Sequence, residues 1–319
     1  MDILFLVAQQ TMYFSIPLLI VALGGVFTER GGVTNIALEG MMIMGAFTSI
    51  LFINKMGGVM SGQLLLLVAI LIAVLTGILF SLFHAYASIN MKADQIISGT
   101  ALNMFAPAFA IYVARMIQAN GVQQITFANT FRITKVPVLG DIPVIGGMFF
   151  RNAYITTYLG LLILIASVIV IYKTRFGLRL RACGEHPHAA DSVGINVYKM
   201  RYIGVMISGA LAGLGGLVFV VPTSTQFNAT VSGYGFLALA VMIFGQWKPK
   251  RVLFAAFFFG LMKTIASAYS VIPILSTMGI PSDVFKMVPF IATLIVLAFT
   301  SKASQAPRAA GQPYDKGSR

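Results

Sequence analysis

The residues that could carry out chemistry are few in this sequence, and they are scattered. It has three histidines (His84, His186 and His188), which lie in or beside loops, and one cysteine, Cys183. A single cysteine excludes an internal disulfide and any multi-cysteine metal site. The sequence shows no cluster of His, Asp, Glu or Cys that would pair a nucleophile with a base or hold a metal ion. We therefore predict no catalytic residue and no metal site, and structural, solvated roles for the histidines.

Glu39 is the clearest candidate for a functional side chain, because it lies inside an apolar stretch. It is about six residues into that stretch, or roughly 9 Å along a helix at 1.5 Å per residue, and Asn35 lies one turn earlier on the same helical face. A charge at membrane depth costs about 2.5–3.5 kcal/mol on insertion scales and needs a partner or a wet cavity. Glu39 either lines a pathway or gate, or makes a structural hydrogen bond to a neighbouring helix.

Other polar residues in apolar stretches are weaker candidates. Lys286 is close enough to a membrane surface to extend its ammonium into water, whereas Lys263 is deeper and could pair with Glu39 or with a ligand. Ser98, Thr100 and Asn103 form a polar patch that could face a substrate. A run of small residues instead predicts close contact between helices: Gly204, Ser208, Gly209, Ala212, Gly213 and Gly216.

The composition sets the class of protein that must position these residues. Of the 319 residues, 58% are hydrophobic and only 10% are charged, whereas a soluble domain has about 25% charged residues. Apolar runs approach the length of about 20 residues that crosses a bilayer as a helix. We therefore predict an all-α polytopic membrane protein.

The chain divides into nine apolar runs within a single membrane domain, residues 1–300. The runs are 3–27, 33–53, 63–83, 96–117, 154–172, 202–221, 236–244, 252–272 and 284–300. The seventh run is too short for a straight crossing. The segment 118–152 is mostly loop, and the composition of 301–319 predicts a flexible tail.

The basic residues set the orientation. The net charge is +13, and the Lys and Arg residues collect in the loop 173–201, after the seventh run and in the tail, without the aromatic interleaving of a nucleic-acid surface. The positive-inside rule places these segments in the cytoplasm. We predict no nucleic-acid partner, an outer N-terminus and outer 118–152 loop, and a cytoplasmic C-terminus in a bacterial cytoplasmic membrane.

The loop 173–201 contains a segment that could bind another protein. After Pro187 a short helix is expected over 188–193, with Gly194 at the position after its C-terminus, where a left-handed conformation suits glycine. The residues alone do not distinguish a docking surface from a solvated turn. The candidate residues are Gly184, Glu185, Pro187, Ala189, Ala190 and Gly194.

This segment resembles the coupling loop of ABC importer permeases of the ribose and nucleoside type, in its pattern Gly184-x-x-Pro187-x-Ala189-Ala190-x-x-x-Gly194-Ile195. The stretch 30–42 (RGGVTNIALEGMM) is similar to the nucleoside branch and lacks the GGIDLSVG typical of the sugar branch. The segments 137–146 and 233–245 also fit, so the resemblance covers about residues 27–300.

The resemblance implies a type II, vitamin-B12-permease-like membrane domain that imports nucleosides through a pathway at a dimer interface. It implies a cytoplasmic ABC ATPase, a second homologous permease chain, an extracytoplasmic substrate-binding (lipo)protein and surrounding membrane lipid. The sequence has no Walker A pattern, so ATP and Mg²⁺ would bind to the partner ATPase and no cofactor to this chain. The alternatives are a permease for simple sugars such as ribose, one for branched-chain amino acids, or a stand-alone secondary transporter or channel.

Overall fold

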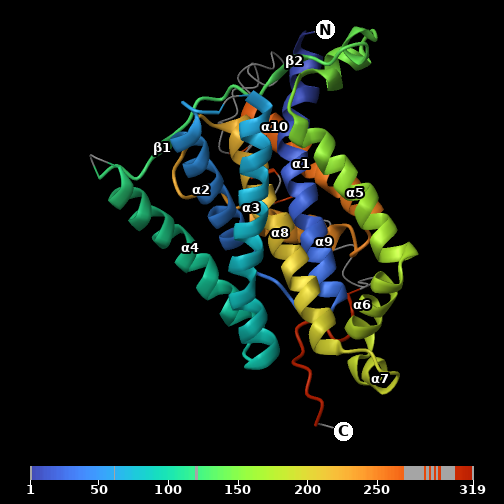
Figure 1. The fold of residues 1–319 in the computed structure, drawn as a ribbon. Helices are drawn as coiled ribbons and strands as arrows, with labels where there is room; N and C mark the ends of the chain where they lie inside the picture. Colours follow the sequence, from blue (N-terminus) through green and yellow to red (C-terminus); the bar gives the residue numbers. More distant parts are fainter. Residues whose placement is uncertain are drawn as a thin grey trace.

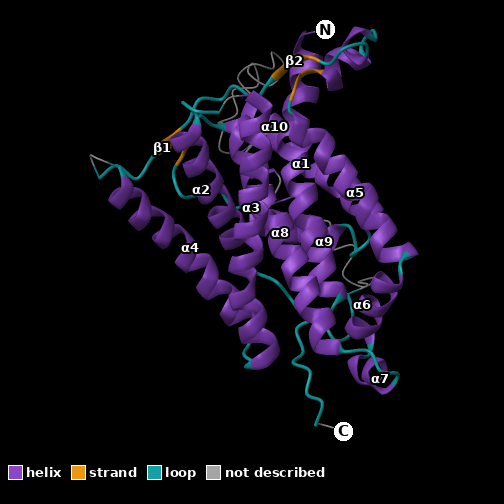
Figure 2. Ribbon diagram, viewed as in Figure 1, coloured by secondary structure: helices purple, strands orange, loops and turns teal. Residues whose placement is uncertain are grey.

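The structure, a computed structural model, describes residues 2–60, 62–118, 121–268, 284, 287–288, 291, 294–295 and 306–317. Over these residues the chain is a helical bundle with short strands at one end (Figures 1 and 2). The α-helices are α1 (Asp2–Arg30), α2 (Leu38–Met56), α3 (Gly62–Ala85), α4 (Gln95–Ile117), α5 (Ile155–Lys173), α6 (Arg175–Glu185), α7 (Pro187–Ser192), α8 (Val197–Thr223), α9 (Tyr234–Phe244) and α10 (Pro249–Ala268). A π-helical segment, Tyr86–Asn90, extends α3.

Six described helices are long and apolar enough to cross a membrane: α1, α3 with its extension, α4, α5, α8 and α10. They confirm the prediction of a polytopic helical membrane protein. Of the other three predicted crossings, the second corresponds to α2 and the seventh to α9, which has only 11 residues. The ninth, 284–300, falls almost wholly outside the described residues.

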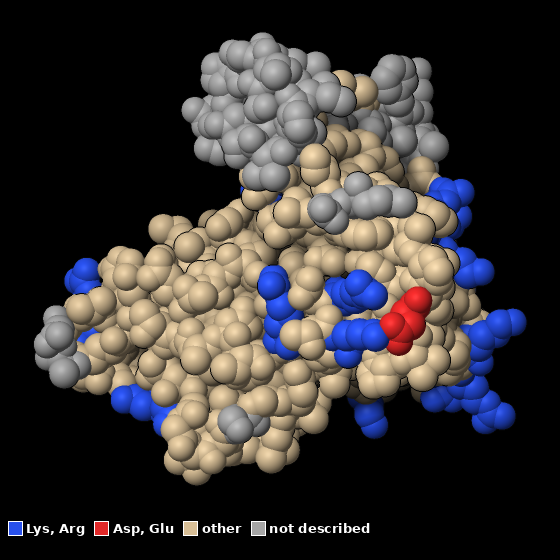
Figure 3. Space-filling model, turned by 90° about the horizontal axis from the view of Figure 1, so that it is seen from above, with Lys and Arg blue, Asp and Glu red and all other residues tan. Residues whose placement is uncertain are grey.

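The two ends of the bundle carry different segments (Figure 1). One end carries the N-terminus and the 118–152 loop. In this loop β1 (Ile125–Thr126) pairs with β4 (Gln226–Phe227), β2 (Ile133–Lys135) pairs with β3 (Arg151–Ala153), and Gly146–Phe150 forms a π-helical turn. Viewed from this end, the surface shows more basic than acidic side chains (Figure 3). The opposite end carries α6, α7 and residues 306–317.

Helices α2, α3 and α8 pack with their backbones in contact. A Cβ atom at Gly77 of α3 would lie 2.0 Å from the carbonyl oxygen of Gly209, and one at Gly213 would lie 2.4 Å from that of Ala73. Gly216 approaches the Met42 carbonyl of α2 in the same way. Side chains larger than hydrogen cannot occupy such positions without moving a helix. The predicted packing role of the small-residue run in α8 is therefore confirmed.

Helices α1 and α4 differ in how much of their surface is covered. In the most apolar stretch of α1, 94% of the residues are buried, compared with 17% in α4. The exposed side chains of α4 are large and apolar, including Met104, Phe105, Tyr112 and Met116. A face of this kind is covered by lipid or by another membrane helix, because water would not solvate it favourably.

Residues 306–317 lie against the end of the bundle that carries α7. Tyr314 and Ala309 are only 3% and 5% exposed. This differs from the flexible tail that the composition of 301–319 predicts. The composition predicts few apolar contacts within the segment itself, but it does not reveal that the bundle offers partners for its backbone and its one tyrosine.

Candidate functional site

The first candidate region is where α1 gives way to α2. The sequence predicts a helix from residue 33, but α2 begins at Leu38, and residues 31–37, here called the α1–α2 connection, are not helical. Gly32 has a φ of +88°, a conformation that suits glycine. Asn35 consequently lies before the helix, and the prediction that it shares a helical face with Glu39 is wrong.

The polar backbone of the α1–α2 connection is satisfied by side chains from other helices. The Thr34 amide donates to Oε1 of Gln95 at 2.6 Å, and Nε2 of His84 lies 3.0 Å from the Thr34 carbonyl oxygen. Non-helical backbone at membrane depth is tolerated only where such partners exist. His84 is fully buried, so the prediction that it is solvated is wrong.

Asn35 and Asn103 complete the start of α2. Oδ1 of Asn35 accepts from the Ala37 amide at 3.0 Å, and its Nδ2 donates to Oγ of Ser208 at 2.9 Å. From α4, Oδ1 of Asn103 accepts from the Gly40 amide and its Nδ2 donates to the Ile36 carbonyl oxygen, both at 2.8 Å. The Gly40 amide is one of the amides that the first turn of a helix leaves without an intrahelical acceptor. Asn103 thus caps α2 from a different helix.

Glu39 plays the same part for α9. Its Oε1 accepts from the Gly233 amide at 2.9 Å, and its Oε2 accepts from the Gly235 amide at 2.6 Å. Gly233 has a φ of +77°, and a Cβ at Gly235 would lie 2.3 Å from the Glu39 backbone nitrogen. A carboxylate at a helix N-terminus is stabilised by both the free amides and the helix dipole. The arrangement favours the structural hypothesis for Glu39, and we call Asn35, Glu39, Asn103, Gly233 and Gly235 the half-helix junction.

The other polar candidates make different contacts. Thr100 is exposed on α4, and its hydroxyl donates to the Ile96 carbonyl oxygen of its own helix at 2.8 Å. Ser98 lies 3.1 Å from Nδ1 of His84. The Lys263 ammonium lies 6.0 Å from the centre of the buried Tyr234 ring, at the start of α9. Lys286 is outside the described residues.

The second candidate region is the loop 173–201. Pro187 occupies the first turn of α7, and Gly194 has a φ of +82°. The Gly194 amide donates to the Asp191 carbonyl oxygen at 2.9 Å, and the Ile195 amide donates to that of Ala190 at 3.0 Å. These two hydrogen bonds form a Schellman motif. The structure therefore confirms the predicted short helix and its terminating glycine.

Five of the six candidate residues of this loop occupy two environments. Ala189 and Gly194 are exposed, and Pro187 is partly so. Ala190 is buried, and a Cβ at Gly184 would lie 2.3 Å from the Arg30 carbonyl oxygen, so these two pack against the bundle. Beside them a groove of about 440 Å³ runs along the turn from α7 to α8. Its lining combines apolar and basic side chains: Phe176, Val193, Ile195, Met200, Arg179 and Lys199.

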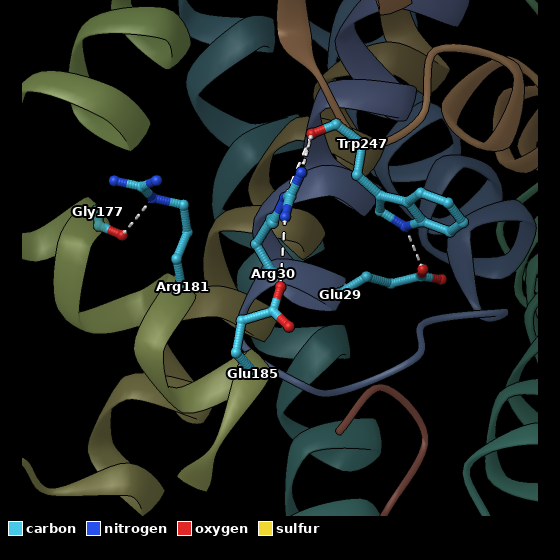
Figure 4. A network of polar contacts seen from close by, with 6 residues as sticks. All are labelled: Glu29, Arg30, Gly177, Arg181, Glu185 and Trp247. Carbon is cyan, nitrogen blue, oxygen red and sulfur yellow. Dashed lines mark hydrogen bonds and ion pairs between the residues drawn. The ribbon is translucent and has the colours of Figure 1, made fainter. Parts of the chain in front are cut away.

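Glu185 belongs to a polar network that joins α6 to the α9–α10 turn (Figure 4). Its carboxylate lies 3.8 Å from Nη1 of Arg30, whose Nη2 donates to the Trp247 carbonyl oxygen at 3.2 Å. The Trp247 indole N–H in turn donates to Oε2 of Glu29 at 2.5 Å. Gln246 and Trp247 both have positive φ values, near +50°, a conformation that persists only where the surroundings fix it. The network fixes Trp247 through its carbonyl oxygen and its indole N–H.

Cys183 is fully buried in α6, and burial raises the pKa of its thiol to about 11. The thiolate is the reactive form, so at neutral pH the thiol is both protonated and covered. We expect N-ethylmaleimide to label the folded chain at pH 7 at least about tenfold more slowly than the chain unfolded in dodecyl sulfate. The labelled fraction is read by intact-mass spectrometry after equal reaction times. Equal rates in the two states at pH 7 would contradict the burial of this thiol.

Comparison with known proteins gives one family and several relatives. The model of the family described as "Branched-chain amino acid transport system / permease component" matches residues 7–297. The chain is 45% identical to the guanosine ABC transporter permease NupQ of Bacillus subtilis, over 100% of this chain and 99% of that protein. It is 41% identical to the nucleoside ABC transporter permease NupC of Lactococcus lactis, over 98% and 97%. A putative glucose ABC transporter permease of Haloferax volcanii is 28% identical, over 94% and 93%. No solved structure shows significant similarity.

Proposed function

Because the chain belongs to the family of permease components of branched-chain amino acid transport systems, we propose that it is the membrane-spanning subunit of an ABC importer for nucleosides. The observation that carries the substrate is the identity of 45% and 41%, over nearly the whole length, to permeases named for guanosine and for nucleosides. The relative named for glucose is more distant, at 28%. Sugars are therefore the first alternative substrate. Branched-chain amino acids, which the family's description names, are the second.

The partners follow from the membership of the family. A separate ABC ATPase would bind ATP and Mg²⁺, and a binding protein would deliver the nucleoside to the opposite side of the membrane. The exposed Ala189 and Gly194, with the adjacent groove of apolar and basic residues, support docking of the ATPase at α7. A second permease chain would cover part of the apolar surface that this chain exposes and complete a pathway of the type II architecture, with nine membrane segments in each chain.

The orientation rests on the basic residues. The end that carries α7 has the larger set: Lys92, Lys173, Arg175, Arg179, Arg181, Lys199, Lys248, Lys250, Arg251, Arg308 and Lys316. By the positive-inside rule, this set supports a cytoplasmic α7 and C-terminus and an outer N-terminus. This is the side on which an ATPase would find ATP.

Uptake by whole cells tests both the substrate and the docking site. Cells that lack this chain should lose uptake of labelled guanosine but keep uptake of ribose and leucine, and the wild-type gene should restore it. With Ala189→Arg, the uptake rate should stay about tenfold or more below that of the wild type, although the chain is present in the membrane. The reason is that a long charged side chain would occupy an exposed position on the proposed docking surface.

Val59→Arg is the matched control for a new charge, because Val59 is 78% exposed in the turn after α2, at the end of the bundle opposite α7. A chain with Ala189→Arg that restores uptake fully would contradict docking at α7. Loss of ribose or leucine uptake, with guanosine uptake intact, would contradict the nucleoside assignment and leave the membership of the permease family untouched.

A further inference from the structure

Residues 306–317, here called the C-terminal strap, hold α6 and α7 at several points. The Ala309 amide donates to the Gly184 carbonyl oxygen at 2.9 Å, near the end of α6. The Tyr314 ring lies 5.1 Å from the His188 ring of α7, and the Lys316 ammonium lies 3.8 Å from the Asp191 carboxylate near the end of that helix. The strap therefore contacts α7 near both of its ends.

The strap is also anchored to the membrane helices. Nη1 of the buried Arg201, in α8, donates to the Gln312 carbonyl oxygen at 2.9 Å. The Tyr314 ring lies 5.4 Å from that of Tyr198, also in α8. The Lys92 ammonium, just before α4, lies 2.6 Å from the Asp315 carboxylate. The hydrogen bond to Lys92 lowers the pKa of the Asp315 carboxyl group, and a hydrogen bond from the Gly317 amide lowers it further. The carboxylate is therefore charged at neutral pH, as the ion pair with Lys92 requires.

The third set of contacts joins the strap to the α1–α2 connection. A Cβ at Gly32 would lie 3.4 Å from the Ala309 carbonyl oxygen and 3.0 Å from Nη2 of Arg201. A Cβ at Gly311 would lie 3.4 Å from the Thr34 hydroxyl. One 12-residue segment thus packs against α7 on one side and, on the other, against the connection that contains Asn35 and leads to Glu39.

We propose that the C-terminal strap is a positioning element that carries movement of α7 to the α1–α2 connection and so to the half-helix junction. This inference rests on the proposed function, in which an ATPase acts on α7. α7 has six residues, of which Ala190 is buried against the bundle, so the strap adds contacts to those that α7 makes by itself. The strap gives α7 a continuous chain of packed contacts to the α1–α2 connection, and such chains can carry coupling between distant sites.

The direct test reports on the connection itself, independently of the transported molecule. A cysteine introduced as Thr34→Cys would be labelled with a maleimide in the complete complex of both permeases, ATPase and binding protein in liposomes, with Cys183 as the slow internal reference. A non-hydrolysable ATP analogue should change the labelling rate at residue 34 by about fivefold or more in the full-length chain. The change should vanish in a chain that ends at residue 305 and in Tyr314→Ala, and should persist in Tyr314→Phe, which keeps the ring.

A second readout is the amount of nucleoside taken up per ATP hydrolysed, which should fall by about fivefold or more in the shortened chain while ATP hydrolysis continues. Asp315→Lys should lower this ratio, and adding Lys92→Asp should restore it. If the shortened chain fails to assemble, Tyr314→Ala against Tyr314→Phe decides. A response at residue 34 that is the same with and without the strap would overturn the proposal. A normal response at residue 34 without nucleoside uptake would support the strap and contradict the nucleoside assignment.

Discussion

Replacing Glu39 by glutamine is expected to lower the thermal stability of the permease by several degrees. Both carboxylate oxygens accept backbone hydrogen bonds at the start of α9, from Gly233 and Gly235. Glutamine has one oxygen, so its NH₂ group would face one of the two amide N–H groups and leave it without an acceptor. Glu39 is only 7% exposed, so water is a poor substitute.

The size of the effect follows from the two hydrogen bonds. Hydrogen bonds to charged groups contribute about 1.5–3 kcal/mol each, and an unsatisfied buried amide costs a further 1–3 kcal/mol. A total of about 3 kcal/mol corresponds to a fall in Tm of roughly 6–12 °C for chains of 150–250 residues, and to somewhat less for a longer chain. The measurement is the unfolding midpoint of the purified complex in detergent, together with its yield from membranes.

Thr100→Val is the matched control, because Thr100 is also a pathway candidate in a membrane helix but is exposed, and within the described residues its hydroxyl bonds to its own helix. It should leave the midpoint within about 1–2 °C of the wild type, as surface substitutions usually do. If instead Glu39→Gln unfolds at the wild-type temperature and abolishes uptake, Glu39 lines the pathway and its capping role is secondary.

The local parts of this structure could be predicted because their causes are local in the sequence. Pro187 suits the first turn of a helix and Gly194 favours the left-handed conformation that ends one, so α7 is determined by residues within eight positions of each other. The apolar runs predicted the six long helices for a similar reason, since length and hydropathy alone identify a crossing.

The half-helix junction could not be predicted in this way, because each cap comes from a distant part of the chain. Asn103 caps α2 from α4, and Glu39 caps α9 across nearly 200 residues. The sequence indicated that buried polar side chains needed partners, but not which backbone they would satisfy. A break in a helix also cannot be recognised within an apolar run. Val33 and Ile36 are equally apolar whether the backbone is helical or extended, so their hydropathy does not distinguish the two conformations.

The roles of His84 and Gln95 were not predicted, because their positions in the sequence suggested solvated side chains. Both lie at the ends of apolar runs, where a polar residue is usually solvated, and both turn inward to Thr34. The signal that could have found them is their position: they flank the α3–α4 turn, and the backbone of a nearby connection between helices must find donors and acceptors.

The second large effect is expected at Gly77, where alanine should reverse its usual influence on a helix. In the interior of a helix alanine is more stable than glycine by about 0.5–1 kcal/mol. At Gly77, however, the added methyl group would lie 2.0 Å from the carbonyl oxygen of Gly209. The nearest atoms belong to backbone, so no side-chain rotation relieves the overlap, and α3 must move away from α8.

Such overpacking costs about 1–3 kcal/mol and sometimes more, so Gly77→Ala should lower both the unfolding midpoint and the yield of the complex. Gly58→Ala is the control, because a Cβ at Gly58 would meet no atom within 4 Å, and it should change the midpoint by no more than about 1–2 °C. A Gly77→Ala chain as stable as the wild type would show that α3 and α8 can separate without loss. In that case the close backbone contact through Gly77, Gly209 and Gly213 would not be what holds the centre of the bundle together.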